Sequence, residues 1–591
     1  MKARWLFTAL AFLGLARLAP DCRAASLAFQ REDVTIPDGV GIRSYAMAID
    51  FDSDGSLDLV ITRLVSPPTD PPTYVPVHAL RNLGHGQFTN ATASVLGTVQ
   101  TVLARDLRTA DFDGDGRTDL FMGESGNDAP PFPGGQSLLL TQTADGKLRN
   151  DTSSRLPQLL TFTHHATVGD VNGDLNPDIY LANIYNEGLV GPLVYINDGH
   201  GNFTSQSNAL PPEIVGLSVR YTSCLLVDVS KRGVLDLVLG GHNAAPYALT
   251  ETSDRLLLND GHGSFAYAPL NTLPPRHGGT NWETINIASA DFDGDGWPDL
   301  LMSEELNYQE PFIQLLLNNQ DGTFRDASSN IPQSWPAPPS GNNWFPFLRV
   351  VDLDGDGSPD FVCTHQYGPP QIFLNDGTGT FTSANELFPS GTPSNVIDIV
   401  PGDFDGDGNP DLFVLSGYGQ AALLRNLLPP RVGAYSSTKT NQAIVFPRIG
   451  RRNAANGPVT LNATASSGLT VSYEVLSGPA TVSSNLVTFT RPGSITLWAT
   501  QSGNASFNPA VPVEQTFIVI TAPFLSAYGV VSNQFGFNIT GESNQIVVLE
   551  ASTNLSNWSS LATNTLDASP LYFIDPAWQT FQGRFYRARL Q

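Results

Sequence analysis

Residues 403–411 read DFDGDGNPD, an acidic nonapeptide followed by an apolar run, and this pattern returns along the chain at intervals of about sixty residues. Five copies keep the form DxDxDGxxD and begin at Asp50, Asp111, Asp291, Asp352 and Asp403. Two further copies are altered: DVNGDLNPD from residue 170 and DVSKRGVLD from residue 228. Seven regular copies predict seven structural repeats.

The spacing of the acidic residues suits a calcium ion. Calcium takes six to eight oxygen ligands, and carboxylates at alternate positions of a short loop can all turn toward one point. In the copy at residue 403 the glycine at the sixth position, Gly408, permits the sharp turn that aims a following carbonyl inward. The expected ligands are the side chains of Asp403, Asp405, Asp407 and Asp411 and the backbone carbonyl of Asn409.

The same positions in the other intact copies give four more expected calcium sites. Their side-chain and carbonyl ligands are Asp50, Asp52, Asp54, Asp58 and Ser56; Asp111, Asp113, Asp115, Asp119 and Arg117; Asp291, Asp293, Asp295, Asp299 and Trp297; and Asp352, Asp354, Asp356, Asp360 and Ser358. An acidic surface turn is the alternative for any single copy. Five regularly spaced copies favour metal binding.

The two altered copies predict graded binding. In the third, Asp170, Asn172, Asp174, Asp178 and the carbonyl of Asn176 could hold a weaker sixth ion, although a leucine replaces the turn glycine. In the fourth, Ser230 and Arg232 stand where carboxylates belong. A cation at the metal's position repels calcium, so we expect this loop to be empty.

The loop differs from an EF-hand, which needs a glutamate at position 12 between two helices. That position holds Ile61, Met122, Met302, Cys363 and Val414. The flanking segments, such as RSYAMAID and DLVIT, are short, alternating and rich in β-branched residues, which indicates strands. The sequence therefore predicts a calcium loop within a β-hairpin.

A second signal follows each loop. An apolar strand leads into a Gly-rich turn that ends in phenylalanine, as in LLLNDGHGSF to Phe265 and IFLNDGTGTF to Phe381. Each repeat then contains four antiparallel strands. Seven such repeats predict an all-β, seven-bladed β-propeller of four-stranded blades.

The ends of the repeat region suggest how the ring closes. The seventh repeat runs into Pro429 and Pro430 without its last strand, whereas the segment around Phe29 resembles that missing strand. We expect the Phe29 strand to complete the last blade, which removes an open sheet edge.

These loops and turns resemble those of the FG-GAP/VCBS repeat family, which includes the propeller of integrin alpha subunits and a group of calcium-containing sugar-binding propellers. The resemblance covers residues 26–428. It implies a seven-bladed propeller with calcium in the hairpin that joins the first two strands of each blade. The third and fourth loops depart from the family pattern, which puts those two metal sites in doubt.

The chain begins with a basic residue pair, an apolar run and small residues near residue 25, which is typical of a cleaved secretion signal over residues 1–25. Cys22 leaves lipoprotein processing as an alternative. Cys224 and Cys363 fall in different repeats, so we expect both to be buried and free. The net charge of −25 disfavours nucleic-acid binding. We expect a secreted or cell-surface monomer with no membrane span.

After a linker over residues 429–440, short strands with Ser-Gly turns predict an immunoglobulin-like β-sandwich over residues 441–522. Residues 523–591 predict a smaller, fibronectin-like β module with Trp558 in its core.

The hairpin order places calcium loops and Gly turns on one face of the propeller and the longer, variable loops on the other. In the integrin relatives that other face binds the ligand. Aromatic residues on these loops suit sugar stacking or protein contact. They are Tyr74, Phe132, Tyr185, Tyr247, Trp282, Tyr308, Trp335 and Trp344. The alternative is that Trp282 and Trp344 only fill the end of the central channel.

The leading hypothesis is an extracellular recognition or adhesion protein for a glycan or protein ligand, without catalytic residues. No nucleophile elbow or HExxH motif is present. A polysaccharide lyase or hydrolase is the alternative, with Glu124, Glu304 or Glu305 and a histidine of the variable face as acid and base. A structural cell-surface component is the third.

Overall fold

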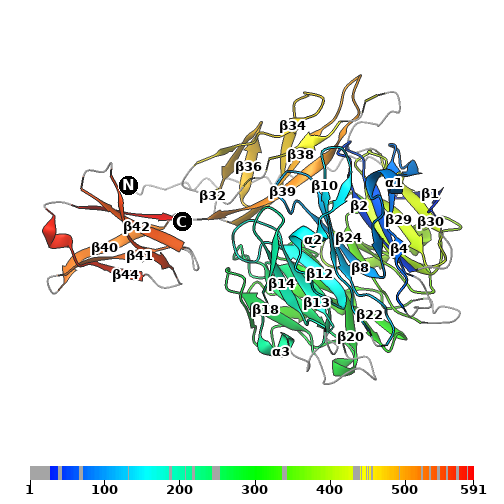
Figure 1. The fold of residues 1–591 in the computed structure, drawn as a ribbon, viewed down its shortest axis with the longest axis horizontal. Coiled ribbons are helices and arrows are strands. Elements are labelled where there is room, and N and C mark those ends of the chain that lie inside the picture. Colours follow the sequence, from blue (N-terminus) through cyan, green and yellow to red (C-terminus); the bar gives the residue numbers. More distant parts are fainter. Residues whose placement is uncertain are drawn as a thin grey trace, which may run out of the picture.

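The computed structural model is almost entirely β-structure (Figure 1). It describes residues 27–590 except 38–42, 65–70, 131, 185–188, 207, 216–219, 243–252, 336–341, 430–438, 441, 448, 450–451, 454–456, 491–492, 521–522, 532–533, 542–545, 554–556, 567–570 and 582–583. The predicted secretion signal lies outside the described residues.

Seven four-stranded antiparallel sheets fill the region between residues 29 and 426. From the first strand of each sheet outward they are β2 (Arg43–Ile49), β3 (Asp58–Leu64), β5 (His78–Asn82) and β6 (Phe88–Asn90); β8 (Ala104–Ala110), β9 (Asp119–Glu124), β10 (Leu138–Gln142) and β11 (Leu148–Asn150); β12 (Thr163–Gly169), β13 (Asp178–Asn183), β14 (Leu193–Asn197) and β15 (Phe203–Gln206); β16 (Tyr221–Val227), β17 (Asp236–Gly241), β18 (Arg255–Asn259) and β19 (Phe265–Tyr267); β20 (Glu283–Ala290), β21 (Asp299–Leu306), β22 (Glu310–Asn318) and β23 (Phe324–Asp326); β24 (Leu348–Val351), β25 (Asp360–Cys363), β26 (Gln371–Asn375) and β27 (Phe381–Ser383); and β28 (Val396–Gly402), β29 (Asp411–Ser416), β30 (Ala421–Asn426) and β1 (Phe29–Val34).

The first strands of neighbouring sheets contact one another in a closed circle: β2, β8, β12, β16, β20, β24, β28 and again β2. The sheets therefore radiate from a common centre like the blades of a propeller, as predicted from the repeat. Short elements join them: a β4 (Val75–Pro76) and β7 (Gln100–Thr101) pair, the helices α1 (Thr92–Val95), α2 (Thr152–Arg155) and α3 (Pro212–Val215), and the 3₁₀ turns η1 (Gly279–Asn281), η2 (Ser328–Asn330) and η3 (Asn385–Leu387).

The predicted closure is confirmed. Strand β1 pairs antiparallel with β30, with Phe29 opposite Asn426 and Val34 opposite Ala421. The N-terminal strand thus completes the sheet whose other three strands come last in the repeat region. The closure ties the two ends of the repeat region together and covers the outer edge of β30.

Apolar cores lie between adjacent sheets. The second strands are the most deeply buried, because both of their faces pack on neighbouring sheets; all residues of β9, β13 and β29 are buried. Cys224 and Cys363 are free and buried in these cores, as predicted.

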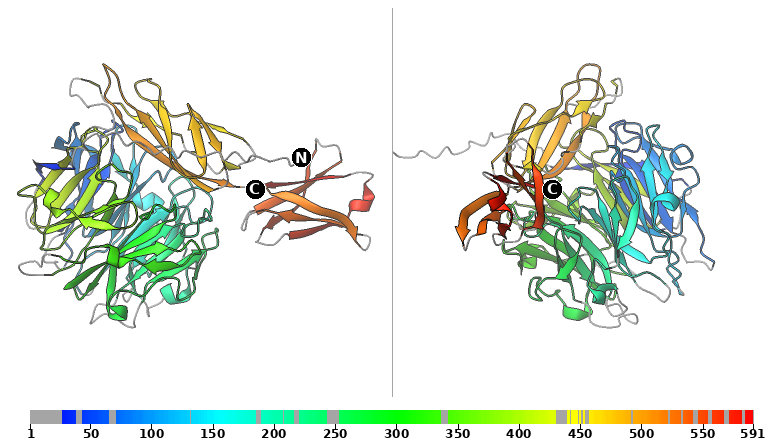
Figure 2. Two further views of the ribbon diagram at one scale, coloured as in Figure 1. Left: turned by 180° about the vertical axis from the view of Figure 1, so that it is seen from behind. Right: turned by 60° about the vertical axis from the view of Figure 1, so that its left-hand side comes forward.

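A second β region follows, with its own core around Leu461, Val487, Leu497 and Phe517. Its strands are β31 (Ile444–Val445), β32 (Arg452–Asn453), β33 (Val459–Thr460), β34 (Thr464–Ala465), β35 (Ser472–Ser477), β36 (Ala480–Ser483), β37 (Leu486–Phe489), β38 (Gly493–Gln501) and β39 (Ala510–Ile520). Figure 2 shows this region lying against the propeller. Its immunoglobulin-like character stays a prediction.

The third β region extends away from the propeller (Figures 1 and 2). It has two three-stranded sheets, formed by β40 (Phe524–Val531), β41 (Gln534–Thr540) and β44 (Leu571–Asp575), and by β43 (Ser559–Thr565), β42 (Ile546–Ser552) and β45 (Phe585–Leu590), with the turn η5 (Trp578–Thr580). Phe537, Ile539 and Leu549 are in its core. The prediction that Trp558 is a core residue is wrong: Trp558 is half-buried and does not belong to this core, and the Arg587 guanidinium lies 4.2 Å from its ring centroid.

Candidate functional site

Each acidic loop joins the first two strands of its sheet and folds back on its own first aspartate. The backbone N–H at the sixth position donates to that aspartate, as from Gly55 to Asp50 Oδ2 at 3.0 Å and from Gly408 to Asp403 Oδ2 at 2.9 Å. The sixth-position glycines of the intact loops have φ between 85° and 90°. That conformation strains any residue with a side chain, which is why glycine stands there.

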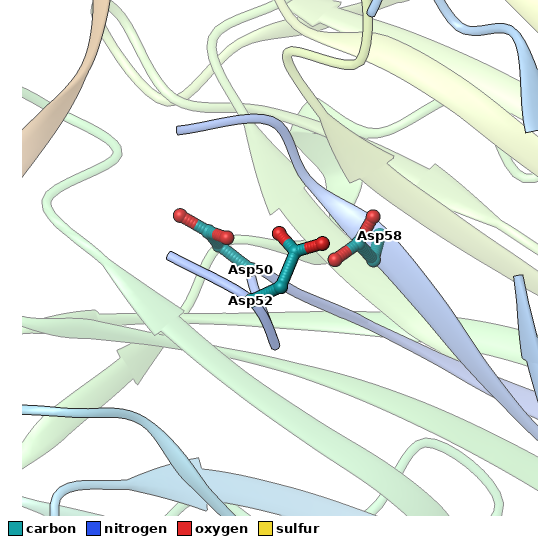
Figure 3. Close-up of side chains that lie close together, drawn as sticks. All are labelled: Asp50, Asp52 and Asp58. Carbon is teal, nitrogen blue, oxygen red and sulfur yellow. The ribbon is translucent and has the colours of Figure 1, made fainter. Parts of the chain in front are cut away.

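The five intact loops bring three carboxylates together, with ligand atoms within 4.8 Å of one another. Figure 3 shows Asp50, Asp52 and Asp58 in the first loop. The grouped residues are Asp50, Asp52 and Asp58; Asp111, Asp113 and Asp115; Asp291, Asp293 and Asp295; Asp352, Asp354 and Asp356; and Asp403, Asp405 and Asp411. Among the described residues, the third and fourth loops form no such group.

The donor set fits a hard dication. Asp52, Asp113 and Asp291 each have a buried Oδ1 without a hydrogen-bond partner among the described residues. Burial raises the pKa of Asp50 and of Asp403 to about 7, and that of Asp58 to about 9. Carboxylates gathered in this way are costly to ionise unless a cation compensates them, and all-oxygen donor sets are what calcium prefers.

Arginines lie beside the third-position aspartates. Arg81 Nε is 2.7 Å from Asp52 Oδ2, and Arg325 Nη2 is 3.0 Å from Asp293 Oδ2. Each arginine offsets part of the loop's negative charge.

The altered loops differ as their sequences suggest. In the third loop, Leu175 occupies the turn position with φ 73°, which is strained for a leucine. In the fourth, Arg232 Nη2 lies 2.6 Å from Asp236 Oδ1, so a guanidinium pairs with the last carboxylate of the loop. The fourth loop holds together through an internal ion pair.

The ninth-position aspartates have a structural role besides any metal contact. Asp299 accepts backbone N–H groups from Phe292 at 2.8 Å and from Asn318 at 2.8 Å, and the other intact loops repeat this arrangement. In the loops that begin at residues 111, 291 and 352, the closest carboxylate group consists of positions one, three and five. The ninth aspartate there primarily fixes the loop to the third strand.

A ring of asparagine amides, which the sequence reasoning missed, links neighbouring blades. Asn318 Nδ2 donates to the Val229 carbonyl of the preceding blade's loop at 2.8 Å and to the Pro298 carbonyl of its own loop at 3.1 Å. Equivalent pairs to the preceding loop join Asn82 to Phe404, Asn197 to Phe112, Asn259 to Val171, Asn375 to Phe292 and Asn426 to Leu353. In the second blade Gln142 reaches the Asp50 carbonyl at 3.2 Å. The available signal was the asparagine that ends the third strand in every blade except the second.

These contacts place the Gly turns beside the acidic loops, on one face of the propeller. The second β region touches the same face: a Cβ built on Gly55 would lie 2.3 Å from the Gln442 carbonyl oxygen. A small cavity between the two parts is lined by Gly55, Asp403, Asp405 and Pro509. Two of the intact loops therefore lie at an interdomain contact.

The opposite end of the propeller's centre contains a pocket with a volume of about 90 Å³. It is lined mainly by residues at or near the start of the first strands, which come from six blades. They include Tyr45, Arg105, His164, Thr222, Glu283 and Phe347. Because each first strand runs from this end toward the acidic loop, the pocket and the loops lie at opposite ends of the propeller's centre.

Polar and aromatic groups meet in this pocket. His242 Nδ1 approaches Glu283 Oε2 at 2.6 Å, and Arg105 Nη2 lies 2.5 Å from Asp128 Oδ2. The rings of Tyr308 and Trp344 meet edge to face with centroids 5.2 Å apart. Neither Arg105 nor Glu283 was singled out from the sequence, because neither belongs to a motif.

The aromatic residues predicted on the variable face lie in different environments. Trp344 and Tyr308 line the pocket, and Tyr74 is exposed. Trp335, which was predicted on the variable face, is half-buried: its ring packs on Phe345 and Phe373, and its Nε1 donates to the Pro311 carbonyl at 3.1 Å.

Phe132 packs against Phe162, and Trp282 packs against His277 and Phe312, outside the pocket lining. Tyr185 and Tyr247 lie outside the described residues.

The three glutamates considered as catalytic acids are buried, and each accepts a hydrogen bond from a backbone N–H group. Glu124 Oε1 accepts the N–H of Leu103 at 2.6 Å, and Glu304 Oε2 accepts that of His277 at 2.9 Å. Glu305 accepts the Tyr308 N–H. None of the three lines the pocket.

Comparison with known proteins supports this architecture in part. A family model described as an FG-GAP-like repeat matches residues 50–122, 246–302 and 352–414. The chain carries FG-GAP-like repeats in these three regions. No curated protein matches the chain significantly.

Two solved structures are similar to this chain. One is an exo-β-1,3-galactanase variant from Phanerochaete chrysosporium with β-1,3-galactotriose: 11% identity, 72% of this chain, 91% of that chain and TM-score 0.27. The other is an Aleuria aurantia lectin mutant in complex with Fucα1-6GlcNAc: 12% identity, 60% of this chain, 100% of that chain and TM-score 0.33.

Among the described residues, no helix is both long and apolar enough to cross a membrane.

Proposed function

We propose that this chain is a secreted, calcium-binding propeller that recognises an extracellular glycan or protein ligand on the face opposite its acidic loops. The observation that carries the proposal is the division of the molecule into two ends. Carboxylate loops and the asparagine ring occupy one end, and a pocket with aromatic and ionisable groups occupies the other. Calcium then acts as a structural ion, and recognition falls to the pocket end.

In this proposal each intact loop binds one calcium ion through its aspartate side chains and one backbone carbonyl. The bound ion supplies positive charge that holds the buried carboxylates together. The asparagine ring transmits that order to the neighbouring blade, because each amide contacts two successive loops.

Metal analysis and melting test the calcium part. We expect five calcium ions per chain, with a weaker sixth at Asp170, and a lower melting temperature after chelation. A ligand present at a hundred times its Kd stabilises a site by about 2.7 kcal/mol, so losing several ions must be visible in a melting curve. Two ions or fewer would contradict the loop assignment.

A screen of glycans and extracellular proteins on the mature chain tests the recognition part. Retention of a ligand without turnover supports a binding protein. If no ligand is retained, the structural cell-surface component is the better description.

A polysaccharide lyase or hydrolase is the second candidate, and the close approach of His242 to Glu283 favours it. A carboxylate and an imidazole in one pocket are groups that general acid–base catalysis uses. Release of reducing ends or unsaturated ends from a polysaccharide, abolished by Glu283→Gln, would replace the binding function with this one.

A further inference from the structure

The central pocket has a buried carboxylate oxygen with no donor. Glu283 is 1% exposed and lines the pocket. Its Oε2 lies 2.6 Å from His242 Nδ1, but neither Oε2 nor Oε1 has a hydrogen-bond partner of good geometry among the described residues. An acceptor buried without a donor costs free energy, so a ligand hydroxyl that donates to Oε1 would be favoured there.

The pocket's arginine is already paired. Arg105 Nη2 lies 2.5 Å from Asp128 Oδ2, and Glu283 Oε2 lies 2.6 Å from His242 Nδ1. Burial lowers the pKa of His164 and of His165, so these two imidazoles are neutral at pH 7. Among the described residues that line this pocket, a uronate, sulfate or phosphate group would therefore meet no unpaired guanidinium and no charged His164 or His165.

The remaining lining is aromatic. Tyr308 and Trp344 form one edge-to-face pair, and Tyr45 and Phe347 form another with centroids 5.6 Å apart. Aromatic rings favour ligands that combine an apolar face with hydroxyl groups, and a small number of polar groups then fix the orientation.

From these observations we propose that the central pocket binds one residue of a neutral saccharide, with Glu283 accepting a hydroxyl hydrogen and Trp344 and Tyr308 packing on the sugar ring. The pocket's small volume limits it to a single sugar residue or part of one, such as a chain end. This inference rests on the proposed recognition function, and it names the site and the class of ligand.

The test uses the mature chain with calcium on an array of neutral, uronate-bearing and sulfated oligosaccharides, followed by titration calorimetry with the tightest neutral binder. We expect neutral glycans to bind and Glu283→Gln to weaken binding at least tenfold, because the amide keeps only one acceptor oxygen and places an NH2 donor at the other position. Trp344→Leu is expected to weaken binding similarly. Because it changes a different side chain, at the pocket's rim, it still tests the pocket if the Glu283 variant does not fold. Melting curves check the folding of both variants.

Tyr74→Ala is the matched control, since Tyr74 lies on a variable loop, is 64% exposed and does not line the pocket. Glycan binding that falls in Tyr74→Ala but survives in Glu283→Gln and Trp344→Leu would overturn the pocket assignment while leaving the recognition function standing. Preference for uronates or sulfates would overturn the neutral class. Binding to no glycan at all would overturn the inference, and retention of a protein ligand in the wider screen would then decide whether the recognition function survives.

Discussion

Asn318 Nδ2 donates a 2.8 Å hydrogen bond to the carbonyl oxygen of Val229, a residue eighty-nine positions earlier in the chain. Val229 belongs to the acidic loop of the preceding blade, and the same amide also bonds Pro298 in its own loop. One side chain thus fastens two successive loops. Its repetition from blade to blade makes the acidic loops a connected ring instead of independent sites.

Asn318→Ala is expected to destabilise the propeller by about 1–3 kcal/mol, because it leaves the buried Val229 carbonyl and the half-buried Pro298 carbonyl without this donor. The measurement is the unfolding midpoint in excess calcium. Asn319→Ala is the control, since the neighbouring Asn319 is exposed and bonds only Thr323 within its turn. Equal midpoints for the two variants would show that the asparagine ring does not stabilise the fold.

The fourth loop gives a gain-of-site prediction. It keeps Asp228, Asp236 and a sixth-position glycine, Gly233, with φ 76°, so only two positions depart from the intact pattern. The double substitution Ser230→Asp with Arg232→Asp removes the internal ion pair and restores the carboxylates. We expect one more calcium ion per chain by equilibrium dialysis.

Ser230→Asn with Arg232→Asn is the matched control for that experiment. It also removes the guanidinium but adds no charge, so the ion count should stay at the wild-type value. An unchanged count in the aspartate variant would mean that the backbone of the fourth loop cannot form the site.

The raised pKa of Glu305 leads to a predicted pH effect on the stability of the fold. Burial first, and the nearby charge of Glu283 second, raise the pKa of Glu305 to about 8 in the folded chain. A folded-state pKa above the unfolded one stabilises the fold at low pH, and this contribution is lost as pH rises toward 8. Glu305→Gln should therefore gain stability relative to wild type between about pH 5 and pH 8, by at most about 1.4 kcal/mol per pH unit.

Unfolding curves at several pH values in saturating calcium measure that difference. Glu310→Gln serves as the control because Glu310 is exposed on the adjoining strand. A difference between Glu305→Gln and wild type that does not change with pH would show that Glu305 ionises normally in the folded protein.

The repeated parts of the molecule could be predicted from the sequence because their causes are local. Loop spacing, strand alternation and the missing strand of the seventh repeat sufficed for the blades and for the pairing of β1 with β30. The pocket could not be predicted in this way. Arg105 and Glu283 lie in different blades, and only the closed circle of first strands brings them together.

Trp335 shows the corresponding limit for a single residue. Its Pro-rich surroundings indicate an exposed loop, but the ring turns inward between Phe345 and Phe373. Aromatic side chains in long loops often find an apolar surface to cover, and which surface is near depends on the tertiary fold. The asparagine ring was missed for a similar reason, since one partner of each amide is in the preceding blade.

The contact between Gly55 and the second β region gives the last prediction. Gly55 and Gly116 occupy the same position of two intact loops, with φ 88° and 85°. A Cβ on Gly55 would collide with the Gln442 carbonyl, whereas a Cβ on Gly116 would meet nothing within 4 Å. Both alanine variants carry the free-energy cost of a left-handed backbone at a residue with a side chain, about 1 kcal/mol. Any difference between their melting temperatures should therefore come from the contact with Gln442.

Only Gly55→Ala should release the second β region from the loop face. Small-angle scattering should show a larger radius of gyration, and limited proteolysis should cut the 429–440 segment faster than in Gly116→Ala. If both variants keep the wild-type dimensions and cleavage rate, the contact at Gln442 does not hold the two parts together. If both expand equally, the loop conformation and not the contact controls the docking.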